Sequence, residues 1–186
     1  MVQESPIYTR TGDAGTTGLY KGPRVNKSSL RVATYGIVDE LNSHISSAKA
    51  FSNHQDIKNL LERIQHKLMN VASILASELG VAPKETIPTI SELDIIGLER
   101  CIDYFSRDLP QITSFIIPGQ NQAGAMLDIA RTTCRRTERQ IALLSETEPV
   151  NPVIKQFLNR LSDLLFTLER YEHYRSGFND QFWNKS

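Results

Sequence analysis

The segment Asp56–Leu75, "DIKNLLERIQHKLMNVASIL", decides the fold. Its apolar residues recur at alternating intervals of four and three. That spacing places them on one stripe of a helix that can pack against other long helices, so it predicts a bundle helix over residues 56–79. Gly80 and Pro83 follow in the usual order for a helix end. The stripe consists of Ile57, Leu61, Ile64, Leu68, Val71 and Leu75.

Helical periodicity extends to both sides of this segment. It predicts helices over residues 30–50 and 122–144, and two more that begin at Ser91 and Asn151 and end before Pro110 and at Tyr174. Asp94 would complete a capping box with Ser91, and Pro152 suits a first helical turn. Short connections between long amphipathic helices favour an antiparallel arrangement. The sequence therefore predicts an all-α fold, an antiparallel five-helix bundle without strands.

The length and composition suit one globular domain over residues 1–186. It would consist of an N-terminal arm (1–27), the helical bundle (28–175) and a polar tail (176–186) that either docks or stays loose. The formal net charge is zero, and no apolar run approaches the roughly 20 residues of a membrane span. We therefore expect no nucleic-acid or membrane partner. Without a leader segment the cytoplasm is the expected compartment, or mitochondria if the protein is eukaryotic.

The arm carries a glycine- and threonine-rich loop, "YTRTGDAGTTGLYKGPRVNK", from Tyr8 to Lys27. Its G-x-x-G-x-x-G spacing matches neither the dinucleotide-binding nor the Walker pattern. Glycines still allow backbone amides to approach phosphate oxygens closely, and the threonines and cations add further donors. The loop therefore indicates an anion-binding site, and the alternative is a flexible arm without a ligand.

Polar residues recur at helical spacing beside the apolar stripes of three predicted helices. In "RTTCRRTER" four arginines occur within nine residues, balanced by one acid. Arginine suits bidentate phosphate contacts, so this face would complement the anion-binding loop. The alternative is three solvated faces with internal salt bridges. The stripes are Arg131, Arg135 and Glu138; Tyr35, Asp39 and Asn42; and Asn159, Asp163, Phe166 and Arg170.

Five motifs in order, "YTRTGDAGTTGL", "YGIVDELNS", "FIIPG", "RTTCRRTER" and "NRLSD", resemble those of the PduO-type ATP:cob(I)alamin adenosyltransferases. The resemblance runs from Tyr8 to Tyr174. It implies a five-helix bundle that forms a homotrimer with its sites at subunit interfaces. It also implies transfer of the 5′-deoxyadenosyl group of ATP to cob(I)alamin, with Mg²⁺ accompanying the ATP. A reductase and an adenosylcobalamin-dependent acceptor enzyme would be further partners.

The resemblance also implies roles for individual residues. ATP would be bound by the arm through Thr9, Arg10, Thr11, Gly12, Asp13, Gly15, Thr17 and Lys27. A neighbouring subunit would complete the nucleotide site with Arg135, Arg136, Thr137, Glu138, Arg139 and Asn159. Asp39 would pair with Arg131 across the interface, and Phe115 would lie against the corrinoid and favour loss of its lower axial ligand. Arg135, Glu138, Phe115, Asp39 and Arg131 form the expected catalytic set, with no protein-bound metal.

The chemistry is consistent with these roles. Cobalt is the nucleophile, so no general base is needed, and positive groups such as Arg135 and Lys27 can stabilise the departing triphosphate. The chain departs from the family pattern at Gln120, Thr137 and Glu169. Of these, Gln120 and Glu169 would affect how the corrinoid is bound. One alternative is a trimer that binds ATP or corrinoid, or delivers the cofactor, without catalysis. Another is a helical interaction module with a disordered arm.

Overall fold

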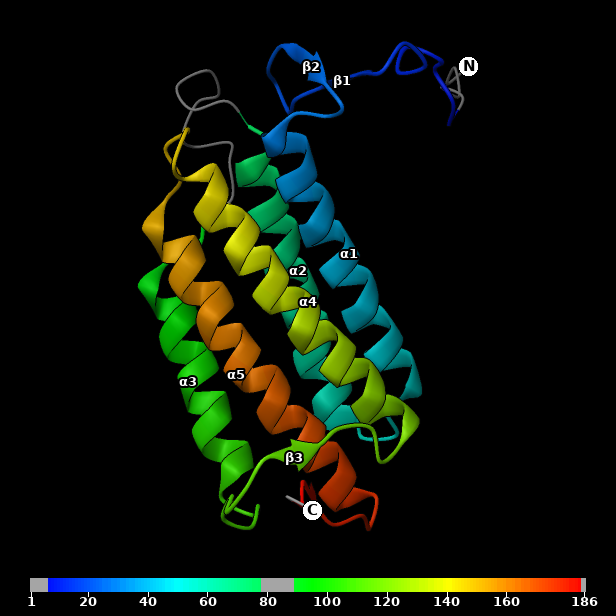
Figure 1. Ribbon diagram of the computed structural model, residues 1–186, viewed down its shortest axis with the longest axis vertical. Coiled ribbons are helices and arrows are strands. Elements are labelled where there is room, and N and C mark those ends of the chain that lie inside the picture. Colours follow the sequence, from blue (N-terminus) through cyan, green and yellow to red (C-terminus); the bar gives the residue numbers. More distant parts are fainter. Residues whose placement is uncertain (1–6, 78–88, 185–186) are drawn as a thin grey trace.

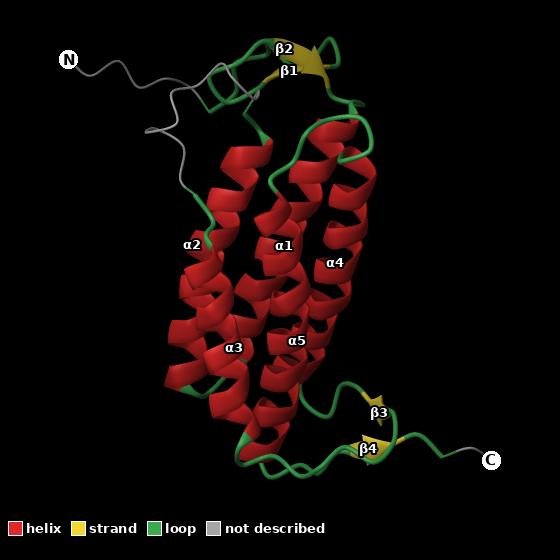
Figure 2. Cartoon of the chain, turned by 90° about the vertical axis from the view of Figure 1, so that its left-hand side faces the viewer, coloured by secondary structure: helices red, strands yellow, loops and turns green. Residues whose placement is uncertain are grey.

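The computed structural model describes residues 7–77 and 89–184 of the chain. Five long helices form an elongated bundle, with a small two-stranded sheet at each end (Figures 1 and 2). The helices are α1 (Leu30–Phe51), α2 (Gln55–Leu75), α3 (Glu92–Ser106), α4 (Gln122–Leu144) and α5 (Pro152–Arg175). The strands are β1 (Thr16–Gly18), β2 (Arg24–Asn26), β3 (Ile116–Ile117) and β4 (Gln181–Phe182).

The predicted helices are confirmed, and their ends follow from local chemistry. The side chains of Ser29, Asn121 and Asn151 cap α1, α4 and α5 by accepting backbone N–H bonds. The Ser91 amide donates to the Asp94 carboxylate at 2.9 Å at the start of α3. The part of the predicted second helix beyond residue 77, including Gly80 and Pro83, lies outside the described residues.

All six residues of the α2 stripe are buried in one core, together with the apolar stripes of α1, α4 and α5. α1 packs on α2 and α4, and α5 packs on α4 and α3. Consecutive neighbours run antiparallel, but α3 and α5 run in the same direction (Figure 1). Helices that follow one another along the chain are thus antiparallel, as predicted, and α3 runs parallel to α5 because α4 comes between them in the sequence.

The prediction of no strands is wrong for four short segments. β1 pairs with β2 in the arm, and β3 pairs antiparallel with β4, so that Ile116 lies opposite Phe182. The tail is thus docked through residues 181–183, and the Trp183 amide donates to the Phe115 carbonyl at 2.7 Å. Strands of two or three residues are too short to show an alternating pattern, so sequence periodicity could not reveal them.

Candidate functional site

The glycine-rich arm folds into a tight turn held by its own backbone and side-chain contacts. Gly15 has a φ of 81°, a left-handed conformation that glycine adopts without strain, and its carbonyl accepts from the Lys27 amide at 2.9 Å. A Cβ at Gly12 would lie 3.1 Å from the Lys27 Nζ, so the ammonium group rests against the turn. Arg24 bonds the Thr11 carbonyl at 2.6 Å and the Thr16 hydroxyl at 2.8 Å. These contacts bring Thr11, Thr16 and Lys27 together around the turn.

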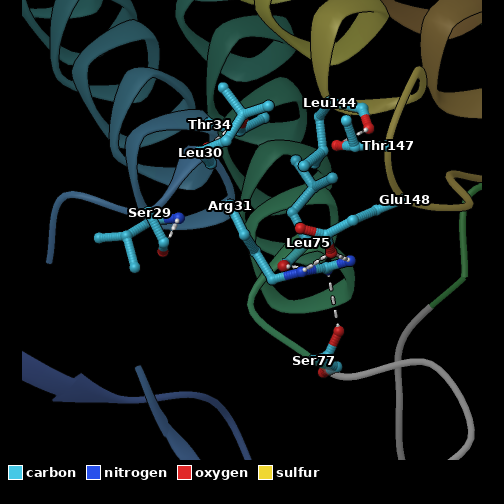
Figure 3. Close-up of polar contacts among 10 residues, drawn as sticks. Ser29, Leu30, Arg31, Thr34, Leu75, Ser77, Leu144, Thr147 and Glu148 are labelled. Atoms are coloured by element: carbon cyan, nitrogen blue, oxygen red, sulfur yellow. Dashed lines mark hydrogen bonds and ion pairs between the residues drawn. The ribbon is translucent and has the colours of Figure 1, made fainter. Parts of the chain in front are cut away.

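The arm is seated on the C-terminal end of α2. The Tyr20 amide donates to the Ala76 carbonyl at 2.8 Å. The carbonyls on either side, those of Leu75 and Ser77, accept from the buried Arg31 guanidinium at 2.8 and 3.1 Å. Arg31 also bonds Glu148, at 2.7 Å from its Nε (Figure 3). One arginine thus satisfies helix-end carbonyls of α2 and joins α1 to the segment after α4.

The exposed face of α4 carries both paired and unpaired arginines. Arg131 bonds Asp128 one turn earlier at 2.7 Å, and Arg136 bonds Glu40 of α1 at 2.5 Å. The Arg136 guanidinium holds the pKa of the Glu40 carboxyl below its usual value. Within residues 7–77 and 89–184, the exposed side chains of Arg135 and Arg139 have neither a hydrogen bond nor an ion pair. Two guanidinium groups one turn apart are therefore available for an anion.

Glu138 and Asn159 meet between α4 and α5. The Asn159 side-chain amide donates to Glu138 at 3.2 Å, and both residues line a polar hollow of about 480 Å³ together with Lys155 and Arg160. Thr137 is fully buried, and its hydroxyl donates to the Thr133 carbonyl at 2.9 Å. Thr137 therefore supports this face from inside, because its hydroxyl is already engaged with the helix backbone.

Phe115 lies at the other end of the molecule, immediately before β3. Its side chain is 77% exposed, and its ring meets the Trp183 ring edge-on with 6.2 Å between centroids. Both rings line an apolar hollow of about 490 Å³ with Ile112, Thr113 and Ser114. Sequence reasoning singled out Phe115 but missed Trp183, because only the pairing of β3 with β4 brings them together.

The described part of the chain offers neither a metal cluster nor an activated thiol. No group of three or more His, Cys, Asp or Glu residues gathers there to hold a metal ion. Cys134 is fully buried, and burial raises the pKa of its thiol. No helix among the described residues has the length and apolarity to cross a bilayer.

The family profile described as cobalamin adenosyltransferase matches residues 7–172, nearly the whole length over which these features occur. The chain belongs to the cobalamin adenosyltransferase family. The cobalamin adenosyltransferase of Cupriavidus metallidurans is 41% identical over 185 residues, which cover 97% of this chain and 95% of that relative. The corrinoid adenosyltransferase PduO of Citrobacter freundii is 41% identical over 174 residues, and the matched region spans 52% of its length.

A solved structure shares this family's architecture. A variant PduO-type ATP:corrinoid adenosyltransferase from Lactobacillus reuteri, complexed with cobalamin and ATP, is 35% identical, with a TM-score of 0.90. The match covers 97% of this chain and 100% of that one. The family resemblance read from the five motifs is therefore confirmed.

In this cobalamin adenosyltransferase family member, one chain does not bring the expected site residues together. The arm and the Phe115 segment lie at opposite ends of the bundle (Figure 1). Asp39 is exposed on α1, and Arg131 takes Asp128 as its partner within the chain. The predicted pairing of Asp39 with Arg131 across subunits stays a prediction. Within one chain, the arm therefore lies far from the Phe115 segment.

Proposed function

We propose that the protein transfers the 5′-deoxyadenosyl group of ATP to the cobalt of cob(I)alamin, giving adenosylcobalamin and triphosphate. The observation that carries the proposal is the pair of unpaired guanidinium groups, Arg135 and Arg139, on α4 of a cobalamin adenosyltransferase family member. A polyanionic leaving group needs such donors. The structures of relatives with cobalamin and ATP bound support both substrates.

The reaction balances without a protein nucleophile. The electron pair of Co(I) forms the cobalt–carbon bond at the ribose C5′, and the C5′–oxygen bond breaks. Its electron pair leaves with the triphosphate. Arg135 and Lys27 stabilise the charge that develops on this leaving group, and Mg²⁺ enters as part of the MgATP substrate. Glu138 and Asn159 hold each other at the edge of the polar hollow and orient the nucleotide.

The corrinoid binds against the apolar hollow at Phe115 and Trp183. An exposed phenylalanine beside an indole ring offers an apolar surface to a large macrocycle. Such a wall also excludes water and an axial ligand from the lower face of the cobalt. A reductase has to supply the Co(I), and an enzyme that uses adenosylcobalamin has to accept the product.

The protein works as a homotrimer in which the arm of one subunit meets α4 of the next. The separation of the arm from Phe115 within one chain supports this assembly. The unpaired Arg135 and Arg139 support it as well, since an anion held between two chains would give them a partner. Asp39 on α1 is exposed and available to reach Arg131 of a neighbouring subunit.

Purified protein with MgATP and chemically reduced cobalamin tests the function. We expect the absorption spectrum of adenosylcobalamin to appear, together with one triphosphate for each corrinoid converted. Tight ATP binding without product would favour the non-catalytic delivery trimer instead. Folded protein that binds neither substrate would contradict the proposal.

Mixed assemblies test whether the site spans subunits. We expect Lys27→Ala and Arg135→Ala each to inactivate the protein, because they remove cations from the two halves of one site. If the halves come from different chains, random co-assembly restores about a quarter of the sites. Activity of the co-expressed, co-purified variants provides the measurement.

The matched control co-assembles Lys27→Ala with Thr17→Ala. Both changes lie in the arm, so every arm in the mixed assembly carries one of them and no site has an unmodified arm. Arm variants that complement each other, or a Lys27/Arg135 mixture that stays inactive, would contradict a shared site.

A further inference from the structure

Two buried polar residues at the C-terminal end of α5 have no role in the proposed transfer reaction. Glu169 and His173 lie one helical turn apart, and they are 2% and 1% exposed. Each keeps one polar atom without a partner among the described residues, Oε1 of Glu169 and Nδ1 of His173. Burying such groups is costly unless they serve a specific contact.

Both residues contact the backbone of the segment that follows Phe115. The Gly119 backbone lies close enough to the Glu169 carboxylate to favour its ionised form and so to lower its pKa. The next amide, that of Gln120, donates to Nε2 of His173 at 3.2 Å. Gly119 has a φ of 92°, which only glycine adopts readily, and this conformation turns consecutive amides toward the same helix.

Close packing between α4 and α5 makes the histidine contact possible. A Cβ at Gly124 would lie only 2.0 Å from the His173 ring, so only glycine fits there. Burial lowers the pKa of the His173 imidazole, so the ring is neutral near pH 7 and its Nε2 can accept the Gln120 hydrogen bond.

The segment held in this way carries the apolar wall. β3 lies between Phe115 and Gly119 and pairs with β4, and the Gln120 side chain also donates to Gln181 at 3.1 Å. A shift of the Gly119–Gln120 turn would therefore move Phe115 and Trp183 together.

We propose that Glu169 and His173 are positioning residues that fix residues 115–121, and with them the aromatic wall against which the corrinoid binds. The role of the wall rests on the proposed function, whereas the two backbone contacts do not. Glu169 acts through Gly119, and His173 acts through Gln120.

The surroundings of Glu169 make its contact depend on pH. Burial, together with the nearby carboxylates of Asp128 on α4 and Asp180 in the tail, raises the pKa of the Glu169 carboxyl to about 7. Arg131 of α4 and the Gly119 amide oppose this shift. The ionised carboxylate is the stronger acceptor, so the contact to Gly119 tightens as pH rises through this value.

Other charged groups nearby are already paired. Arg170, on the same helix, holds Asp180 at 2.6 Å. Glu172 faces the turn between α1 and α2, where it accepts from the Ser52 hydroxyl at 2.8 Å and lies 3.7 Å from Nε2 of His54.

Trp183 reports on the wall without any substrate, because it is the only tryptophan in the chain and its ring contacts Phe115. We expect the Trp183 fluorescence of the ligand-free protein to change with pH, with a midpoint near the pKa of Glu169, about 7. Glu169→Gln should abolish the transition, while Glu62→Gln, an exposed carboxyl on α2, should retain it. A transition that persists in Glu169→Gln, or none in the wild type, would overturn the proposal.

Corrinoid kinetics provide the second readout. Glu169→Ala should raise the KM for corrinoid about tenfold, the effect of losing one hydrogen bond to a charged group, and leave the KM for ATP unchanged. Circular dichroism verifies that the variant is folded, and Glu169→Gln, which keeps an acceptor, should recover most of the affinity. An unchanged corrinoid KM in Glu169→Ala would overturn the positioning role. A wild type that shows the fluorescence transition but binds no corrinoid would instead overturn the proposed function.

Discussion

Replacing Arg135 by alanine is expected to lower kcat for adenosylcobalamin formation by about 10²–10³-fold, the usual loss when one donor to a developing charge is removed. Arg135 is exposed and has no side-chain partner on its own chain, so the change should leave the free energy of unfolding nearly unaltered. Initial rates measured spectroscopically with saturating MgATP and reduced cobalamin test this expectation.

Two further variants test whether the loss of kcat is specific to the guanidinium group of Arg135. Arg107→Ala removes an exposed guanidinium at the end of α3 and should leave kcat unchanged. Arg135→Lys keeps the charge but loses the planar fork, so it should fall between the wild type and the alanine variant. An Arg135→Ala enzyme within threefold of the wild type would remove this residue from the proposed site.

Arg31→Met should lower the free energy of unfolding by about 3 kcal/mol, at the lower end of the range for breaking a buried ion pair. The guanidinium is buried, but its partner Glu148 is partly exposed and can recover some hydration. The Leu75 and Ser77 carbonyls lose their donor as well (Figure 3). Urea unfolding followed by circular dichroism, at matched protein concentration, gives the measurement.

The same change should weaken ATP binding, because Arg31 shapes the end of α2 on which Tyr20 seats the arm. Arg175→Met is the control, since that guanidinium lies 3.5 Å from the Asp56 carboxylate in a half-exposed position away from the polar hollow. Such a surface contact is worth less than about 1 kcal/mol. If both variants lost the same free energy of unfolding, the buried position of Arg31 would add nothing to its contribution to stability.

Local patterns were sufficient to predict the helices. The alternating intervals of four and three in α2 predict which side chains lie on one stripe of the helix, and all six residues of that stripe are buried. The capping residues Ser91 and Asn151 marked two helix starts for the same reason, since a cap needs only residues within one turn.

The site was only partly predictable. Spacing placed Arg131, Arg135 and Glu138 on one face of α4, as found. It could not show that Arg131 and Arg136 are paired while Arg135 is not. Thr137 was assigned both to the core stripe and to the nucleotide site, and its burial places it in the core. Glu169 was noted as a departure from the family pattern, yet its burial against Gly119 is a property of the fold.

By itself, the sequence determined five helices, their buried faces and the family. These features depend on residues within a few turns of one another or on motifs in fixed order. The tertiary structure decided the rest: Arg31 with Glu148, Phe115 with Trp183, and Glu169 and His173 with the turn after β3. Each of these contacts joins segments far apart in the chain, where periodicity carries no information about which polar group faces which. Packing excluded water from Arg31, Glu169 and His173 and so fixed their partners, whereas the pairing of β3 with β4 placed Phe115 beside Trp183.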